Sequence, residues 1–260
     1  MSPEIYDGYG AEFFSTFAQR WPLNVKCVVY LDQISEPVSS PALARFDLRP
    51  TAEVSGLIDW YAKIAPFPLM NGQVGDGQYD IQFDARQARK VFIEAHACET
   101  FGGKVVWLDA DVITHANVPP DFIDRCLPDD KLCAYLGRPW WKYSETGFIA
   151  WNTEHKGCHQ FMKAYRNIYN SGAIFTRYGW HDCYGFDLLR QQLPASWFVD
   201  LAAGLPECMH PFVNSPIGAF MDHRKGTRKK TRSSKSDLVI QRTEPYWQFD
   251  IGDAGPAEQA

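Results

Sequence analysis

Two aspartates separated by one residue follow a short apolar run in the middle of the chain, in Asp109-Ala110-Asp111. The run before them, Lys-Val-Val-Trp-Leu at 104–108, is typical of a buried strand. Like-charged carboxylates at the end of a buried strand repel each other and lose hydration, which is costly unless a cation lies between them. Ligands of α/β proteins bind outside the carboxyl ends of strands. The triplet therefore predicts a site for Mn²⁺ or Mg²⁺, which in turn binds a diphosphate.

Two other interpretations of the triplet stay open. The plainest is a pair of solvated loop carboxylates. The other is a haloacid-dehalogenase-like phosphatase, which places a nucleophile and a general acid/base two residues apart after a strand. That motif normally lies on the first strand of its domain, whereas Asp109 lies far along this chain. The phosphatase also needs a later acidic pair, and Asp129-Asp130 follows too closely to lie on a separate strand.

A second polar group lies near the C-terminus, at residues 223–229 (His-Arg-Lys-Gly-Thr-Arg-Lys). His223 supplies a nitrogen ligand, Gly226 lets the backbone come close to a ligand, and the neighbouring cations could hold a diphosphate. The alternative interpretation of residues 224–235 is a solvated basic loop or a polyanion-binding patch.

The elements around these residues follow from the spacing of apolar side chains. Phe13, Phe14 and Phe17 recur at helical spacing, and Pro22 ends that helix before an apolar, β-branched run at 25–31. A long helix is expected over 83–100, ended by two glycines and leading directly into the strand at 104–108. Further helices are expected at 52–64, 120–126, 161–169 and 182–193, and strands at 132–136 and 147–151.

A helix that leads into a buried strand is typical of βαβ units. We therefore predict an α/β fold with a Rossmann-like, mixed and mostly parallel sheet flanked by helices, in which the strand at 104–108 lies in the middle of a parallel sheet. The chain is expected to form a single domain over residues 1–250, followed by a disordered tail over 251–260.

Composition excludes several classes of protein. The formal net charge of −5 argues against a surface that is basic all over, so any anion site must be local. The seven cysteines are scattered singly, which indicates neither a zinc cluster nor a disulfide framework and favours a reducing compartment. No apolar run is long enough to cross a bilayer, and the N-terminus lacks the pattern of a signal peptide. A cytoplasmic location is expected, in the host cytoplasm if the protein is encoded by a phage.

The two polar motifs together resemble those of GT-A glycosyltransferases, particularly the glycogenin-like retaining branch and a loose set of bacterial and phage-encoded glycosyltransferases. The matching residues are the run 105–111 and the HxxGxxK pattern of His223, Gly226 and Lys229. In that family the two aspartates and the histidine bind Mn²⁺, and the glycine and lysine bind the donor diphosphate. The resemblance implies a GT-A fold, a metal site of Asp109, Asp111 and His223, and a nucleotide-sugar donor, UDP-linked.

The resemblance also implies roles for residues outside the two motifs. It places the donor against a set of residues that includes the first two of the triplet: Arg86, Lys90, Asp109, Ala110, Gly147, Lys225, Gly226 and Lys229. It assigns Asp182 to acceptor orientation or transition-state stabilisation, and it places Glu145, the second candidate catalytic residue, on the strand that lines the sugar pocket. A structural hydrogen bond or a helix cap is the alternative for both. The chain departs from the family in two places. Residues 1–6 stand where a first nucleotide-binding strand is usual, and Lys230-Thr231 replaces the frequent Pro-Trp.

The activity implied is the metal-dependent transfer of a sugar from a nucleotide-sugar to an acceptor hydroxyl, with retention of configuration. A saccharide acceptor is the first expectation, because nine tryptophans, Trp140 and Trp141 among them, offer stacking platforms for sugar rings. A hydroxymethylated base in DNA is the alternative acceptor, suggested by the basic stretch at 224–235. A sugar-nucleotide-binding module without turnover is the non-enzymatic alternative. The sequence leaves the oligomeric state open.

Overall fold

The computed structural model describes residues 1, 5–32, 45–64, 81–141, 143–176, 181–226 and 228–248. For residues 64, 81–86, 175, 176, 229 and 230 it describes the backbone alone. The tail predicted at 251–260 and most of the connection before the long helix lie outside the described residues.

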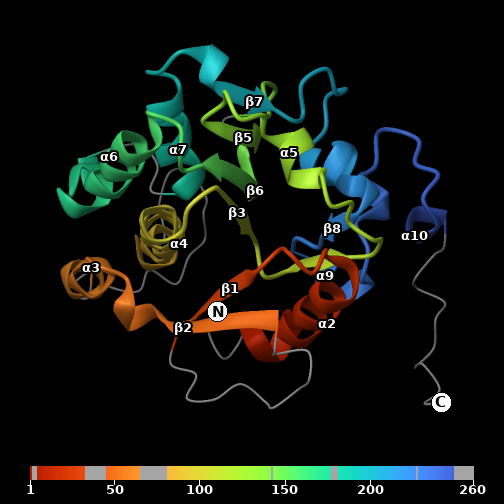
Figure 1. The fold of residues 1–260 in the computed structure, drawn as a ribbon, viewed down its shortest axis with the longest axis horizontal. Coiled ribbons are helices and arrows are strands. Elements are labelled where there is room, and N and C mark those ends of the chain that lie inside the picture. Colours follow the sequence, from red (N-terminus) through yellow and green to blue (C-terminus); the bar gives the residue numbers. More distant parts are fainter. Residues whose placement is uncertain are drawn as a thin grey trace.

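The strands form a layer through the middle of the molecule (Figure 1). Four of them make one sheet in the order β3-β6-β5-β7, a second sheet pairs β1 with β2, and a third pairs β4 with β8. The bounds are β1 Cys27–Leu31, β2 Phe46–Pro50, β3 Lys104–Leu108, β4 Val112–Thr114, β5 Cys133–Leu136, β6 Glu145–Asn152, β7 Phe198–Asp200 and β8 Met221–His223.

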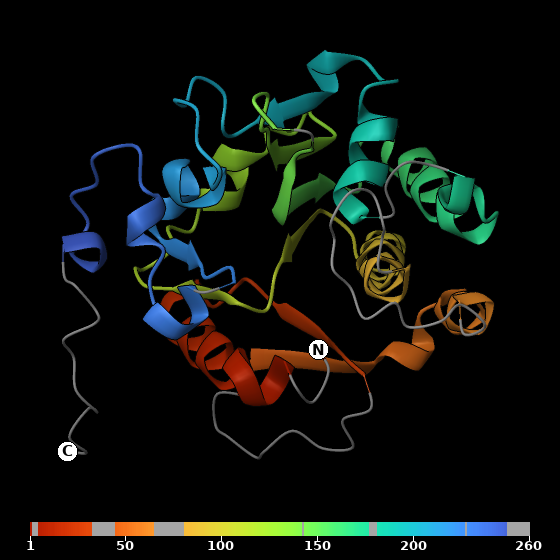
Figure 2. The same cartoon turned by 180° about the vertical axis from the view of Figure 1, so that it is seen from behind.

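Helices cover the strands on both sides (Figures 1 and 2). On one side lie α3 Leu57–Ile64, α4 Ile81–Thr100, α6 Cys158–Asn170 and α7 Asp182–Arg190. On the other lie α2 Ala11–Arg20, α5 Phe122–Cys126, α8 Pro211–Asn214, α9 Arg228–Thr231 and α10 Pro245–Gln248.

Strand β6 shows why both faces of the main sheet are covered. Successive side chains of a strand point to opposite faces. Ile149 and Trp151 accordingly pack into the cluster that contains α4 and α6, whereas Phe148 and Ala150 pack into the cluster that contains Phe212 of α8. Because each face has its own apolar core, strands of this sheet read as continuous apolar runs.

The α/β class and a mixed sheet flanked by helices are confirmed, but the prediction of mostly parallel pairing is wrong. The β1–β2 and β5–β7 pairs are parallel, whereas β3–β6, β5–β6 and β4–β8 are antiparallel. Strand β3, predicted in the middle of a parallel sheet, lies at the edge of the four-stranded sheet, with β6 as its one neighbour among the described strands. The apolar run of β3 reflects the packing of both its faces. Trp107 packs against the cluster that contains α4 and α6, and Val106 packs against the cluster that contains Phe212. Burial on both faces does not depend on the direction of the neighbouring strand.

The other predicted elements are found close to their expected positions, with one interruption. The helix expected over 52–64 is a 3₁₀ turn, Thr51–Glu53, followed by α3 from Leu57. Gly56 separates the two with a φ of +80°, a conformation that a helix does not contain and that glycine adopts readily. Across the described part of the chain, no helix has both the length and the apolarity that crossing a membrane requires.

Candidate metal and donor site

Two short strand pairings bring the acidic triplet and the histidine together. Asp109 continues the β3–β6 pairing, because its backbone N–H donates to the Gly147 carbonyl at 3.0 Å. The chain then turns into β4, which pairs antiparallel with β8 so that Val112 lies opposite His223. The N–H of Arg224 donates to the Asp111 carbonyl at 3.2 Å. This register sets His223 beside the triplet although the two motifs are far apart in the sequence.

Asp109, Asp111 and His223 form a cluster with the geometry of a cation site. The three residues each offer one ligand atom, and these atoms lie within 4.8 Å of one another. His223 Nε2 lies 3.0 Å from an Asp111 carboxylate oxygen and 3.5 Å from one of Asp109. Two carboxylates and an imidazole suit Mn²⁺, and Mg²⁺ less well because it prefers oxygen ligands. The predicted metal ligands therefore fit the ion that the sequence resemblance implies.

Gly147 makes room for the imidazole of His223. A Cβ atom at this position would stand 2.4 Å from both Cε1 and Nδ1 of the ring, far inside van der Waals contact. The ring cannot easily yield, because His223 is 2% exposed. The requirement for glycine therefore follows from the close approach of the histidine, whereas contact of Gly147 with the donor stays a prediction.

We expect Gly147→Ala to displace His223 and to lower Mn²⁺ affinity by about tenfold or more, with a loss of about 1–3 kcal/mol in stability from overpacking. Titration calorimetry and urea denaturation would measure the two effects. Gly102→Ala is the matched control, since a Cβ there has no heavy atom within 4 Å. Equal Mn²⁺ affinity in the two variants would contradict this account of the glycine.

Lys90 of α4 lies beside Asp109, one of the three candidate metal ligands. Its ammonium group lies 3.4 Å from Asp109 and 3.2 Å from Asp182, and it donates to the Thr146 carbonyl. Burial alone would lower the pKa of this lysine, but the charges of Asp109 and Asp182 outweigh burial and raise it. Lys90 is therefore charged and lies beside one of the candidate metal ligands, whereas its contact with the donor stays a prediction. Arg86 lies one turn earlier on α4, and its side chain is outside the described atoms.

Asp182, predicted to be catalytic, lies at the start of α7 and is 6% exposed. The carboxylates of Asp182 and Asp109 both pair with Lys90, which therefore links Asp182 to the candidate metal ligands. The backbone carbonyl of Asp182 accepts a hydrogen bond of 2.8 Å from the Tyr165 hydroxyl, which fixes the first turn of the helix.

Glu145, the second residue predicted to be catalytic, lies deep in the site at the start of β6. It is 1% exposed, and its carboxylate pairs with Lys225 and lies 3.5 Å from His223 Nδ1. Although burial opposes ionisation, the charges of Lys225 and His223 hold the pKa of Glu145 well below its usual range. Glu145 is therefore ionised in the folded protein.

The carboxylates of the site attract positive charge. Four of them, those of Asp109, Asp111, Asp182 and Glu145, lie among Lys90, Lys225 and His223, and Arg138 lies 3.9 Å from Glu145. Burial and Lys225 lower the pKa of His223, but the carboxylates of Asp111 and Glu145 outweigh them and raise it to about 9. A divalent cation would offset the same negative charge, and His223 would bind it as a neutral ligand.

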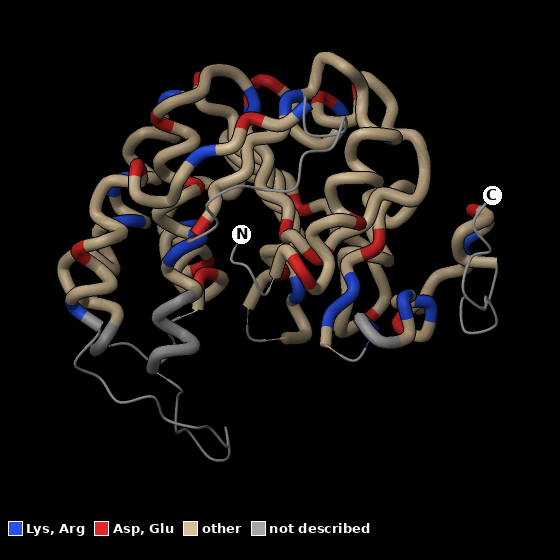
Figure 3. The backbone as a smooth tube through the Cα atoms, turned by 90° about the horizontal axis from the view of Figure 1, so that it is seen from below, with Lys and Arg blue, Asp and Glu red and all other residues tan. Residues whose placement is uncertain are grey.

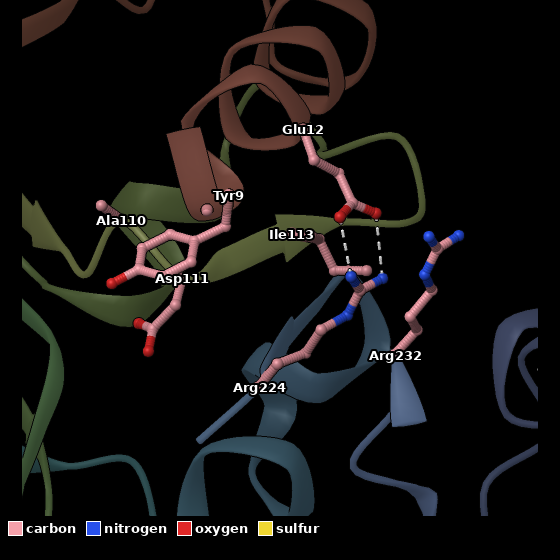
Figure 4. Close-up of a pocket in the computed structure, with 8 residues that line it drawn as sticks. Tyr9, Glu12, Ala110, Asp111, Ile113, Arg224 and Arg232 are labelled. Carbon is pink, nitrogen blue, oxygen red and sulfur yellow. Dashed lines mark hydrogen bonds and ion pairs between the residues drawn. The ribbon is translucent and has the colours of Figure 1, made fainter. Parts of the chain in front are cut away.

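A pocket of about 270 Å³ opens beside Asp111 (Figure 4). Ala110 and Asp111 line one part of it, and Tyr9 and Glu12 from the N-terminal helical segment line another. In the close-up the Tyr9 ring lies next to Asp111. Tyr9 and Glu12 share a helix face at i, i+3 spacing, and neither was predicted from the sequence, because the only signal in that segment was its apolar face.

Three cations of the basic stretch at 224–235, those of Arg224, Lys225 and Arg228, make ion pairs within the protein, so these three do not belong to a solvated patch. The tube view in Figure 3 shows the Lys and Arg positions of the chain in blue among the acidic positions in red. Arg224 makes a bidentate ion pair with Glu12 at 2.8 and 3.0 Å, shown by the dashed lines in Figure 4. Arg228 makes another with Asp237 at 2.6 and 2.7 Å. Gly226 adopts a φ of +54°, in keeping with the glycine predicted for this loop, and the side chain of Lys229 is outside the described atoms.

Asp129-Asp130, the acidic pair that a phosphatase would need, lies near the first residue of β3, whereas the triplet follows the last residue of β3. Asp129 pairs at 2.7 Å with Lys104, the first residue of β3, and its side chain is 93% exposed. Because a strand rises about 3.3 Å per residue, Asp109 lies roughly 16 Å further along. Asp129 is therefore remote from the triplet, which counts against the haloacid-dehalogenase-like interpretation.

One further buried carboxylate, Glu94 of α4, lies behind the site. It is 2% exposed and accepts a hydrogen bond of 2.9 Å from Trp151 Nε1. Burial raises its pKa to about 8, against a partial opposing effect of Lys90. Between about pH 4.5 and pH 8, Glu94 therefore carries a proton in the folded state but not in the unfolded state. The stability that Glu94 contributes is present below about pH 4.5 and is lost as the pH rises through about 8.

We expect Glu94→Gln to remove this pH dependence, because glutamine imitates the protonated acid and can still accept from Trp151. The variant should gain on the order of 2 kcal/mol relative to the parent between pH 5 and pH 9. Urea denaturation across this range measures the difference. Parallel stability curves for the two proteins would contradict a raised pKa at Glu94.

Comparisons with known proteins give structural likenesses only. No family model matches the chain, and the search of curated proteins gave no match. A glycosyltransferase involved in the glycosylation of the major capsid of PBCV-1 is 19% identical with a TM-score of 0.42, over 78% of this chain and 97% of that one. Mouse xyloside xylosyltransferase 1 is 10% identical with a TM-score of 0.48, over 77% and 82%. The bifunctional glycosyltransferase WbbM is 13% identical with a TM-score of 0.45, over 78% and 37%.

All three structures are glycosyltransferases, the class that the sequence resemblance indicated. Each TM-score is below 0.5, so we base the function on the residues of this chain's own site.

Proposed function

We propose that this protein is a metal-dependent glycosyltransferase that transfers a sugar from a nucleotide-sugar donor to an acceptor hydroxyl. The observation that carries the proposal is the convergence of Asp109, Asp111 and His223 within 4.8 Å, beside the pocket lined by Ala110. Lys90 and Lys225 flank the same cluster. Carboxylates, an imidazole and ammonium groups in one place suit a metal-bound diphosphate.

The chain's own residues would act mainly on the leaving group. Bound between the two aspartates and His223, Mn²⁺ would supply the charge that stabilises a departing nucleoside diphosphate. Lys225 and Lys229 would add to that stabilisation as the charge develops. Lys90 would keep Asp109 oriented toward the cation, and Asp182, held by the same lysine, would lie beside the transferred sugar. By its resemblance to the glycogenin-like branch, the reaction would retain the anomeric configuration.

The pocket beside Asp111 would take the nucleoside part of the donor. Its volume of about 270 Å³ is close to the lower end of small-molecule pockets, roughly 300 Å³. Tyr9 offers an aromatic face there, and stacking of a base on an aromatic ring is worth about 1–3 kcal/mol. Ala110 lies between the two metal ligands, so the pocket and the cation site adjoin.

A saccharide is the acceptor that we favour. Trp141 is 52% exposed, which is unusual for tryptophan, and it lies on the loop that leads into β6. Arg138 donates to the Tyr143 and Ser144 carbonyls at 2.8 Å and thereby closes this loop. An exposed indole on a fixed loop suits stacking against a sugar ring. A modified base in DNA has less support as the acceptor, because Arg224 and Arg228 already form ion pairs with Glu12 and Asp237.

Binding of nucleoside diphosphates tests the donor site directly. We expect at least one of UDP, GDP and ADP to bind in the presence of Mn²⁺, with the affinity falling about tenfold in Tyr9→Ala and little in Tyr9→Phe, which keeps the ring. Titration calorimetry with and without Mn²⁺ gives the result. Binding that is the same in EDTA, or in Tyr9→Ala and the parent, would count against the site.

A further inference from the structure

Glu145 has contacts that a residue reserved for the acceptor would not have. Its Oε1 faces His223 Nδ1 at 3.5 Å and accepts a hydrogen bond of 3.1 Å from the Gly147 N–H. Its Oε2 pairs with Lys225 and lies 3.9 Å from Arg138. With 1% of the residue exposed, Glu145 offers no free oxygen to a substrate. Each of these contacts is with the protein, and two of them are with His223 at the end of β8 and with Lys225 two residues later.

We propose that Glu145 is a positioning residue, which holds the Nδ1–H tautomer of His223 so that Nε2 is free to bind the metal, and which keeps Lys225 beside the same site. The proposal rests on the metal site of the proposed function. It gives Glu145 a role that does not involve contact with the acceptor.

The tautomer follows from the chemistry of a neutral imidazole, which carries one N–H donor and one lone pair. His223 Nε2 lies between the two aspartates, so the lone pair must be on Nε2 if this nitrogen is to bind a cation. The proton must then be on Nδ1, and an acceptor facing Nδ1 stabilises that form. Glu145 is the carboxylate on that side. Water is a poor substitute, because His223 is only 2% exposed.

The local backbone supports the same arrangement. Gly147 has no side chain to hold the imidazole away from Glu145, and its N–H fixes the orientation of the carboxylate. Lys225 is two residues after His223, so a single buried carboxylate contacts both ends of the turn that begins at the metal ligand. Loss of the charge at Glu145 would release the lysine and remove the preference for Nδ1–H together.

Two measurements test the proposal. Long-range ¹H–¹⁵N NMR of histidine-labelled protein loaded with Mg²⁺, which is diamagnetic, should show His223 with its proton on Nδ1. In Glu145→Gln, which keeps the shape and loses the charge, Mn²⁺ affinity measured by titration calorimetry should fall about 10- to 100-fold. Glu99→Gln is the matched control: it removes a partly exposed carboxylate that pairs with Arg166, and it should leave Mn²⁺ affinity unchanged.

The outcomes separate this proposal from the metal site itself. If the parent protein binds Mn²⁺ and Asp111→Asn does not, the site stands. Parental Mn²⁺ affinity in Glu145→Gln would then overturn the role of Glu145 alone. A proton on Nε2 of His223 in the loaded parent would overturn both the histidine as a metal ligand and the role of Glu145. The NMR measurement uses the parent protein, so it tests the tautomer even if Glu145→Gln does not fold. Absence of Mn²⁺ binding by the parent would overturn both the proposed function and this role.

Discussion

Replacement of Asp111 by asparagine is expected to abolish Mn²⁺ binding and to lower donor turnover by about 10³-fold, the largest effect that we predict for activity. Metal-ion stabilisation of a transition state is worth several kcal/mol, and each 1.36 kcal/mol changes a rate about tenfold. Asp111 Oδ1 is the carboxylate oxygen 3.0 Å from His223 Nε2. Asparagine keeps the shape of the side chain but removes one of the charges that bind the cation.

Titration calorimetry and electron paramagnetic resonance of Mn²⁺ would measure the loss of binding, and release of nucleoside diphosphate would measure turnover. Asp130→Asn is the matched control, because Asp130 is 72% exposed and pairs only with its neighbour Lys131 among the contacts described for it. Full turnover by Asp111→Asn in the presence of Mn²⁺ would show that the triplet does not bind the functional metal.

The second large effect concerns stability. Lys90→Met is expected to destabilise the fold by about 3–5 kcal/mol, because it leaves buried carboxylates without their cation. Lys90 is 7% exposed and compensates both Asp109 and Asp182, of which Asp182 is 6% exposed. The methionine fills a similar volume, so the cost comes from the unpaired charges and not from a cavity.

Urea denaturation at pH 7 measures this loss, and Lys104→Met provides the control. Lys104 also pairs with two aspartates, Asp124 and Asp129, but their side chains are 70% and 93% exposed. A pair of that kind contributes about 0–1 kcal/mol, so the control should be nearly as stable as the parent. Equal losses in the two variants would contradict the difference in burial on which the prediction depends.

The elements that carry the triplet could be predicted from the sequence because their signals are local. Helix α4 ends at Thr100 and β3 spans Lys104–Leu108, as the helical spacing, the glycine pair and the apolar run indicated. The direction of the neighbouring strands could not be predicted, since an apolar run reports burial and not pairing. The same limit explains why β3 was expected in the middle of a sheet.

The meeting of the triplet with His223 depends on a long-range pairing that leaves little local signal. Strands β4 and β8 have three residues each, too short for a recognisable pattern, yet their register sets Val112 opposite His223. The sequence joined the two motifs only through the resemblance to GT-A glycosyltransferases. The ion pairs of the basic stretch could not be predicted either. Glu12 and Arg224, for example, are far apart in the chain and meet only in the fold.

The most direct test of the central claim is release of nucleoside diphosphate from a panel of sugar nucleotides, with Mn²⁺ or EDTA, by the parent protein and Asp111→Asn. We predict that at least one donor is hydrolysed or transferred by the parent with Mn²⁺, and that both EDTA and Asp111→Asn abolish the release. Binding of a donor without any release, with every acceptor tried, would instead identify a binding module. Release that survives EDTA and the loss of Asp111 would contradict a metal-dependent glycosyltransferase built on this site.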